Sequence, residues 1–141
     1  AVMIGGAVAV PAIRYSPDGS LIASIDLKVI RLRDPLTQRL VRTLRSENSM
    51  FTLAFSSDGQ WLAAGALGNQ VRLWDVASGE EIMQLRAGAG EADPDRAFVW
   101  SLDFHPDGSL LAFSVQAAIT PPAWRVEVWD TLAGQKKLAG E

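Results

Sequence analysis

Short apolar runs separated by turn residues extend along most of this chain of 141 residues. The clearest stretch is 51–85, where four apolar runs alternate with three turns. Within it Phe51, Leu53 and Phe55 recur at every second position, which is the period of a β-strand with one buried face. No apolar period of 3.6 residues runs long enough to indicate a helix. The pattern therefore predicts an all-β fold built of antiparallel meanders.

Three sequence markers recur in the same order and divide the chain into three units. The first is an Asp-Gly turn at Asp18, Asp58 and Asp107, which are 40 and 49 residues apart. Asp can bond back to the backbone and Gly supplies a positive φ, so each turn predicts a tight hairpin. The second marker is a strand whose last residue is Asp. The third marker is the polar turn that follows this strand. The strand ends are Leu32-Arg33-Asp34, Leu73-Trp74-Asp75 and Val128-Trp129-Asp130.

Each unit is predicted to contain four strands. Alternation places Trp100, Leu102 and Phe104 on one face, and Trp61, Trp74, Trp100 and Trp129 are expected in the core. The last outer strand is expected to be short. The predicted strands are 12–15, 21–25, 29–33 and 40–44, then 51–55, 61–66, 71–74 and 81–85, then 100–104, 110–115, 125–129 and 135–138.

Two connections are longer than the repeat requires. The linker 86–97 is polar and exceeds the corresponding linker 45–49, and 117–124 lengthens the third unit between its second and third strands. Pro121 and Pro122 are expected to keep the second insertion out of the strand ladder, which places Trp124 in a loop. Insertions in repeat proteins tend to gather on one face, often the binding face.

These residues resemble the WD-repeat β-propeller family. The resemblance rests on Ser16-Pro17-Asp18-Gly19 with its two counterparts, on Val71-Arg72-Leu73-Trp74-Asp75, and on Val126-Glu127-Val128-Trp129-Asp130. It covers about 12–138, and the unit length of roughly 40 to 45 residues fits the family. It implies a partial β-propeller of three four-stranded antiparallel blades. The single domain 1–141 would divide into 1–45, 46–86 and 87–141.

The sequence departs from the family at the buried hydrogen-bonded network that the family shares. The Gly-His pair before the first strand is missing from all three units. Ser24 matches the network's strand Ser, but Ala64 takes that place in the second unit and Arg33 replaces the Trp in the first. Asn69 lies near the turn position. We therefore expect degenerate blades that are held mainly by apolar packing.

Three blades are fewer than the four to eight that close a propeller. Both terminal blades would expose an apolar face larger than a soluble monomer usually tolerates. Three solutions are open: the remainder of a longer propeller, a homodimer that completes a six-bladed ring, or a docked partner. The missing initiator Met favours a piece of something longer. The apolar segment Ala1–Val10 is interpreted as a strand in preference to a signal-peptide remnant.

Composition narrows the classes of function. The chain is 48% hydrophobic and 21% charged, as in globular proteins. A net charge of −3 argues against a general binder of nucleic acid or of anionic membranes. No apolar run of 18 residues is present to span a bilayer. The absence of cysteine excludes disulfides and thiolate metal sites and fits a reducing, cytoplasmic location.

Catalytic chemistry finds little support in the sequence. The one histidine, His105, occupies a turn position that Ser16 and Ser56 fill in the other units. No nucleophile elbow, phosphate loop or zinc-helix motif is present, so no catalytic residue, metal ligand or cofactor is predicted. The acidic group Glu91, Asp93 and Asp95 matches no calcium loop in full and is interpreted as a solvated loop.

The sequence therefore predicts a non-enzymatic scaffold that binds protein partners. The alternative is a structural or sensory segment of a larger enzyme or signalling protein whose chemistry lies elsewhere. In the resembling family, blade-to-blade linkers and loops between second and third strands share one face. The candidate partner-binding residues on that face are Arg45, Glu47, Arg86, Glu91, Arg96 and Trp124.

Overall fold

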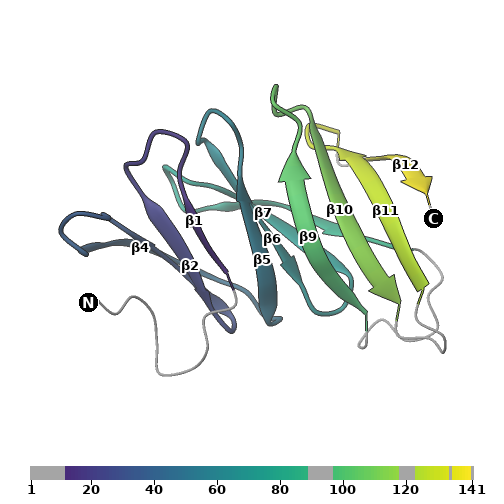
Figure 1. The fold of residues 1–141 in the computed structure, drawn as a ribbon, viewed down its shortest axis with the longest axis horizontal. Coiled ribbons are helices and arrows are strands. Elements are labelled where there is room, and N and C mark those ends of the chain that lie inside the picture. Colours follow the sequence, from purple (N-terminus) through teal and green to yellow (C-terminus); the bar gives the residue numbers. More distant parts are fainter. Residues whose placement is uncertain (1–11, 89–96, 118–122, 134, 141) are drawn as a thin grey trace.

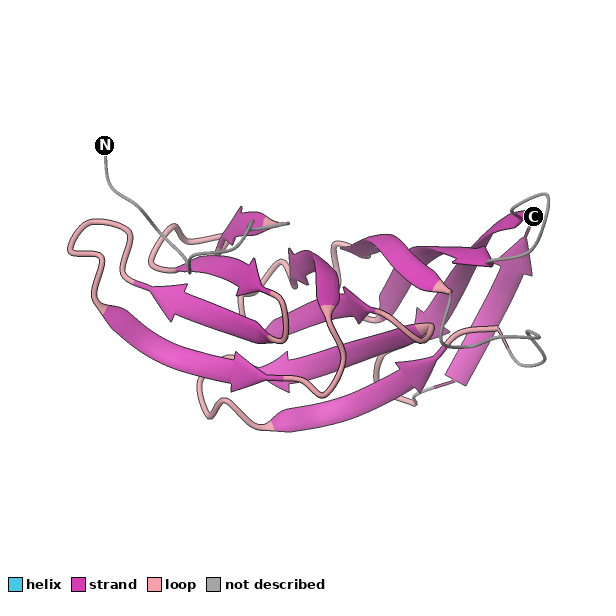
Figure 2. Ribbon diagram, turned by 90° about the horizontal axis from the view of Figure 1, so that it is seen from below, coloured by secondary structure: helices cyan, strands magenta, loops and turns pink. Residues whose placement is uncertain are grey.

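The computed structural model describes residues 12–88, 97–117, 123–133 and 135–140 (Figure 1). Across these residues, the regular elements are twelve β-strands, and no helix occurs (Figure 2). The strands are β1 (Ile13–Tyr15), β2 (Ile22–Asp26), β3 (Val29–Arg33), β4 (Leu40–Arg45), β5 (Met50–Phe55), β6 (Trp61–Ala66), β7 (Gln70–Asp75), β8 (Glu81–Arg86), β9 (Phe98–Phe104), β10 (Leu110–Ala117), β11 (Ala123–Asp130) and β12 (Gln135–Gly140).

The strands form three four-stranded antiparallel sheets, each a meander of consecutive strands. We call them blade 1 (β1–β4), blade 2 (β5–β8) and blade 3 (β9–β12). They follow one another along the long axis of the molecule (Figure 1), and the first strand of blade 2, β5, contacts the first strands of both neighbours, β1 and β9. The predicted partial propeller of three four-stranded blades is confirmed.

Apolar side chains fill both spaces between neighbouring blades. One cluster lies between blades 1 and 2, and its largest buried members include Ile25, Ile30, Leu53 and Trp74. Since both faces of blade 2 are covered, its strands β6 and β7 are buried along nearly their whole length. The cluster between blades 2 and 3 contains Ala54, Ala63, Val71, Leu73, Leu85, Ala87, Val99, Leu102, Phe104, Leu111, Phe113 and Val115.

The Asp-Gly turns are built alike in all three blades. In blade 1, Asp18 Oδ1 accepts bonds from the Ser20 N–H at 2.9 Å and from the Ser16 hydroxyl at 2.7 Å. In blade 3, His105 takes the place of Ser16, and its Nδ1 lies 2.8 Å from Asp107 Oδ1. These three Asp residues are turn formers, as the sequence predicts, and His105 is a turn residue.

The turn hydrogen bonds predict a pH dependence of stability. Bonds from Ser20 and Ser16 lower the pKa of Asp18 from 3.8 to about 2, and bonds from Ser109 lower the pKa of Asp107 to about 2 as well. A folded-state pKa below the unfolded value stabilises the fold above pH 3.8, and that contribution is lost as the pH falls through about 2. As the pH is lowered from 3.8 to about 2, the free energy of unfolding measured with urea is expected to fall. It is expected to fall less steeply with pH for Asp107→Asn than for wild type. Identical slopes for the two proteins would contradict this role.

Two β-bulges overturn part of the predicted alternation. Phe51 and Trp100 have no partner in the ladders of β5 with β6 and of β9 with β10, where the register shifts. The bulge reverses the alternation along β9, so Val99 and Leu102 are buried while Trp100 is 46% exposed. The expectation that Trp100 belongs to the core is wrong. Trp74 is buried, and Trp61 and Trp129 pack against the cluster between blades 2 and 3.

Blade 3 is more complete than the sequence predicts. Its outer strand β12 contains six residues and pairs with β11 over most of its length, so the expectation of a short strand is wrong. Strands β10 and β11 also extend into the predicted insertion, with Ala117 paired to Ala123 and Gln116 paired to Trp124. Trp124 therefore belongs to a strand rather than to a loop. Pro121 and Pro122 lie outside the described residues.

Candidate interaction surface

The blade-to-blade linkers and the turns between second and third strands lie at one edge of the molecule. We call it the linker edge; it is the lower edge of Figure 1, seen from below in Figure 2. Backbone hydrogen bonds join the two kinds of loop. The linker bonds are Ser46 N–H to Lys28 O, Met50 N–H to Leu27 O, Leu67 N–H to Ser49 O, Gly68 N–H to Ala97 O and Ala87 N–H to Asn69 O, all between 2.8 and 3.0 Å.

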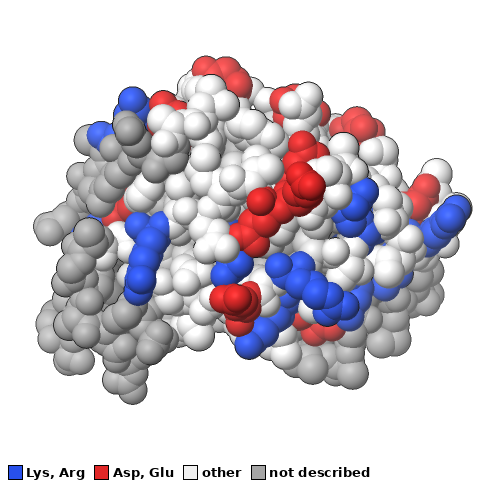
Figure 3. Space-filling model, turned by 180° about the vertical axis from the view of Figure 1, so that it is seen from behind, with Lys and Arg blue, Asp and Glu red and all other residues white. Residues whose placement is uncertain are grey.

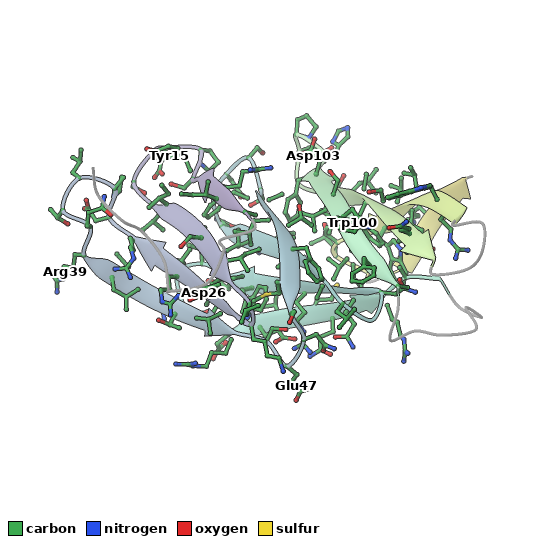
Figure 4. All side chains as sticks on the ribbon, turned by 60° about the horizontal axis from the view of Figure 1, so that its bottom comes forward. Tyr15, Asp26, Arg39, Glu47, Trp100 and Asp103 are labelled. Carbon is green, nitrogen blue, oxygen red and sulfur yellow. The ribbon has the colours of Figure 1, made fainter. Side chains whose placement is uncertain are left out.

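Four of the six predicted partner-binding residues are described, and all four lie at the linker edge. Arg45 and Arg86 are the exposed last residues of β4 and β8. The Glu47 side chain is 92% exposed and points away from the sheets (Figure 4). Trp124, near the start of β11, is 53% exposed. Glu91 and Arg96 lie outside the described residues, as does the acidic group Glu91, Asp93 and Asp95.

A buried arginine ties the first linker to blade 2. Arg72 is only 4% exposed, and its guanidinium lies 3.1 Å from the Glu81 carboxylate. It also donates to Gln70 Oε1 at 3.2 Å and to Asn48 Oδ1 at 3.5 Å, and it lies 3.9 Å from Glu47. A buried charge needs such partners because leaving water is costly. The close contacts of Arg72, to Glu81 and Gln70, therefore lie within blade 2, and its longer contacts reach the first linker at Asn48 and Glu47.

A buried glutamate ties the second linker to blade 3. The Glu127 side chain is fully buried, and its Oε1 accepts the Gly88 N–H at 3.0 Å. Its Oε2 accepts the Trp129 indole N–H at 2.9 Å, and Arg125 Nε lies 3.9 Å away. Gly88 follows blade 2, whereas Glu127 and Trp129 belong to the third strand of blade 3. The carboxylate therefore bonds across the boundary between two blades.

Arg72 and Glu127 occupy the same position in their repeats, two residues before the Trp of the third strand. Neither residue is among those predicted from the sequence, because polar residues alternate with apolar ones in the third strands and such alternation is typical of a strand with one exposed face. A usable signal was present. Between two blades both faces of a strand are covered, so a charge there must be buried and paired.

Two described residues, Ser24 and Asn69, match part of the buried hydrogen-bonded network of WD repeats, and neither side chain makes the hydrogen bonds of that network. Ser24 Oγ and Asn69 Oδ1 are both buried without a hydrogen-bond partner. Asn69 also adopts a positive φ of 57°, which Asn tolerates better than most residues. The apolar clusters between the blades agree with the expected packing. The ionic contacts of Arg72 and Glu127 add to that packing.

Charge is mixed over the molecule. Figure 3 shows acidic side chains along the upper rim, where the Asp-Gly turns lie, and basic and acidic side chains side by side below it. Among the described residues, no group of three or more His, Asp or Glu is placed to hold a metal ion. The described part of the chain contains no helix long and apolar enough to cross a membrane.

Comparison with known proteins agrees with this architecture. A family model for the WD domain, G-beta repeat, matches residues 38–75 and 91–115. The solved structure of U3-55K superimposes with a TM-score of 0.80 over 97% of this chain and 40% of that chain, at 19% identity. Three consecutive four-stranded antiparallel sheets that match part of this structure identify the fold as part of a β-propeller. The chain belongs to the WD-repeat family.

Two relatives extend the comparison at the level of sequence. Periodic tryptophan protein 2 homolog of Schizosaccharomyces pombe is 32% identical over 135 residues, which is 91% of this chain and 15% of that protein. U3 small nucleolar RNA-associated protein 21 of Saccharomyces cerevisiae is 30% identical over 98 residues, which is 69% of this chain and 10% of that protein. The chain therefore spans a small part of the length of either relative.

Proposed function

We propose that this chain is part of a WD-repeat propeller that acts as a non-enzymatic scaffold and binds protein partners through its linker edge. The observation that carries the proposal is the contrast at that edge between exposed side chains and a fixed backbone. Arg45, Glu47, Arg86 and Trp124 are exposed there, on linkers and strand ends that hydrogen bonds attach to the blades. Exposed Arg and Trp on a rigid support are typical of interface hot spots.

Two further observations support a scaffold rather than an enzyme. His105 is the only histidine of the chain, and it is engaged in a turn with Asp107. The other regularly placed Asp side chains accept bonds within their own turns, as Asp34 and Asp130 do. The alternative of a segment within a larger enzyme or signalling protein places any chemistry outside these blades.

We infer that further propeller blades cover the outer faces of blades 1 and 3. The matched structure and both relatives are longer than this chain, which supports the remainder of a longer propeller over a homodimer that completes six blades. We also propose that the domain 1–141 divides into blades at 1–45, 46–86 and 87–141.

The name of the Saccharomyces cerevisiae relative refers to a small nucleolar RNA. By analogy, the whole protein would work in an assembly that contains RNA, while these blades contact its proteins. A net charge of −3 supports protein contacts over direct RNA binding by this chain. The cytoplasmic location expected from the sequence stays a prediction.

Affinity capture with matched variants tests the scaffold role. The protein, expressed in the longest form its gene encodes, is captured from its own cells as wild type, as the double variant Arg86→Ala/Trp124→Ser, and as Leu36→Ser. Leu36 is 93% exposed in the turn between β3 and β4, away from the linker edge, so it controls for loss of a surface apolar residue.

We expect at least one protein to be captured by wild type and Leu36→Ser, including after ribonuclease treatment, and lost with the double variant. Truncation of an interface Arg and Trp costs about 2 kcal/mol or more at a hot spot, which is over tenfold in affinity. Equal capture by all three proteins would contradict the assignment of the linker edge.

A further inference from the structure

Three aromatic rings gather where blades 2 and 3 meet near the linker edge. The ring centroids of Phe51 and Phe98 are 5.5 Å apart, those of Phe98 and Trp100 are 5.5 Å apart, and those of Phe51 and Trp100 are 6.1 Å apart. We call these residues the aromatic cluster. Phe51 belongs to β5, whereas Phe98 and Trp100 belong to β9, as Figure 4 shows for Trp100. Two blades thus contribute to one patch.

The two bulges create this arrangement. Phe51 and Trp100 hold the same place in their repeats, seven residues before Asp58 and Asp107. Each is left without a ladder partner while its neighbours stay paired. A bulge re-aims a side chain, and here it takes a large ring out of the interblade core at corresponding positions in both blades. Phe51 and Phe98 are half-buried, and Trp100 is 46% exposed.

The cluster is fixed before any ligand binds. The Trp100 indole N–H donates to Gln116 Oε1 at 2.7 Å. Gln116 is paired across the sheet with Phe98 on one side and with Trp124 on the other. Leu67, in the β6–β7 turn, forms an isolated bridge with Phe98. Ring orientations held in this way reduce the entropy lost on binding.

We propose that the aromatic cluster receives an apolar anchor side chain, aliphatic or aromatic, from an extended segment of the protein partner. The assignment rests on the proposed function, because it gives the chemistry of a ligand at the linker edge. The cluster is continuous with the interface between blades 2 and 3. Val99, between Phe98 and Trp100, is fully buried in that interface, so an anchor on the rings would extend an existing apolar core outward.

A protein segment fits this site better than single-stranded RNA. RNA-binding aromatic platforms combine stacked rings with a positively charged groove along the backbone. Here Leu67 and Gln116, which pair with Phe98, are uncharged, and Gln116 also accepts the Trp100 indole N–H. The net charge of the chain is −3. An apolar anchor with backbone hydrogen bonds requires no such groove.

Peptide selection tests this assignment. The protein, in the longest form its gene encodes, is panned against phage-displayed random peptides. Binding of the selected peptides is then measured by fluorescence anisotropy to wild type, Trp100→Ser, Phe51→Ser and the exposed control Leu36→Ser. A single-stranded RNA oligonucleotide of mixed sequence serves as the second probe. Circular dichroism confirms that each variant is folded, and Trp100→Phe tests whether an aromatic ring suffices without the indole N–H.

We expect the selected peptides to share an apolar anchor and to lose affinity by about tenfold or more with Trp100→Ser and Phe51→Ser, but not with Leu36→Ser. Trp100→Phe is expected to retain most of the affinity. Unchanged binding to folded Trp100→Ser would overturn the aromatic cluster as the anchor site, as would tight RNA binding that Trp100→Ser abolishes. If Trp100→Ser leaves peptide binding unchanged while Arg86→Ala/Trp124→Ser still loses partner capture, the anchor site is wrong and the proposed scaffold role is retained.

Discussion

Replacing Glu127 by alanine is expected to destabilise the protein by about 3–5 kcal/mol, the range for breaking a buried charge network on one side. The change leaves the Gly88 N–H and the Trp129 indole N–H without the carboxylate that accepts them. Because Gly88 follows blade 2 and Trp129 lies in blade 3, the loss also loosens the connection between two blades. Urea unfolding measures the first effect, and limited proteolysis between Arg86 and Phe98 measures the second.

Matched variants separate the hydrogen bonds of Glu127 from its packing. Glu127→Gln keeps one acceptor oxygen and the side-chain volume, so it is expected to cost less than Glu127→Ala. Trp129→Phe keeps a six-membered ring against the interblade cluster and removes the indole N–H together with part of the ring volume. A double-mutant cycle with Glu127→Gln is expected to give a coupling energy between about 0.5 and 3 kcal/mol. A change in the free energy of unfolding for Glu127→Ala within about 0.5 kcal/mol is typical of surface positions. Such a result would show that the carboxylate does not stabilise the connection between blades 2 and 3.

Adding one methyl group at Gly65 is expected to destabilise the protein by about 1–3 kcal/mol, the usual cost of overpacking a core. A Cβ at this position would lie 2.6 Å from Val99 Cγ1, 2.9 Å from Val99 Cβ and 2.7 Å from Thr52 Cγ2. Gly65→Ala would otherwise stabilise a strand by restricting the unfolded chain, so a loss of stability reports the close contacts at this position, with Thr52 in blade 2 and with Val99 in blade 3.

The origin of this cost can be tested within the same interface. Val99→Ala alone leaves a cavity and is expected to destabilise the protein. Combined with Gly65→Ala it removes the closest clashing atom, Val99 Cγ1, while Val99 Cβ and Thr52 Cγ2 stay in place. The double variant is therefore expected to lose less stability than the sum of the two single variants, although part of the clash remains. Additive losses, measured by urea unfolding, would mean that these residues do not meet across the blades.

The fold was largely predictable because local and repeated signals agree. The Asp-Gly turns at Asp18, Asp58 and Asp107 mark each hairpin by their own chemistry, and period-two alternation marks the strands that follow. The structure confirms these turns and the four strands of each blade. Such features depend on a few neighbouring residues, which is why a single sequence contains them.

Features that depend on register or on neighbouring blades were not predictable in the same way. The bulges at Phe51 and Trp100 leave no mark in the alternation, so Trp100 was expected in the core. Trp124 was expected in a loop because Pro121 and Pro122 precede it in the sequence, but it pairs with Gln116 in a strand. The burial of Glu127 depends on a second sheet that covers its strand. The linker edge followed from the family resemblance, but the aromatic cluster required the structure.

The most direct test of the central claim, that the linker edge of this WD-repeat chain binds a protein, is site-specific photo-crosslinking in cells. A benzophenone amino acid is placed at position 124, on the linker edge, or at position 36, in the β3–β4 turn. Both positions are exposed, so a partner can reach either of them. Because they lie on opposite edges of the blades, an adduct from one position identifies the edge that the partner contacts. We predict a discrete protein adduct from position 124 and none from position 36. An adduct from position 36 alone, or an RNA adduct from position 124, would contradict the account.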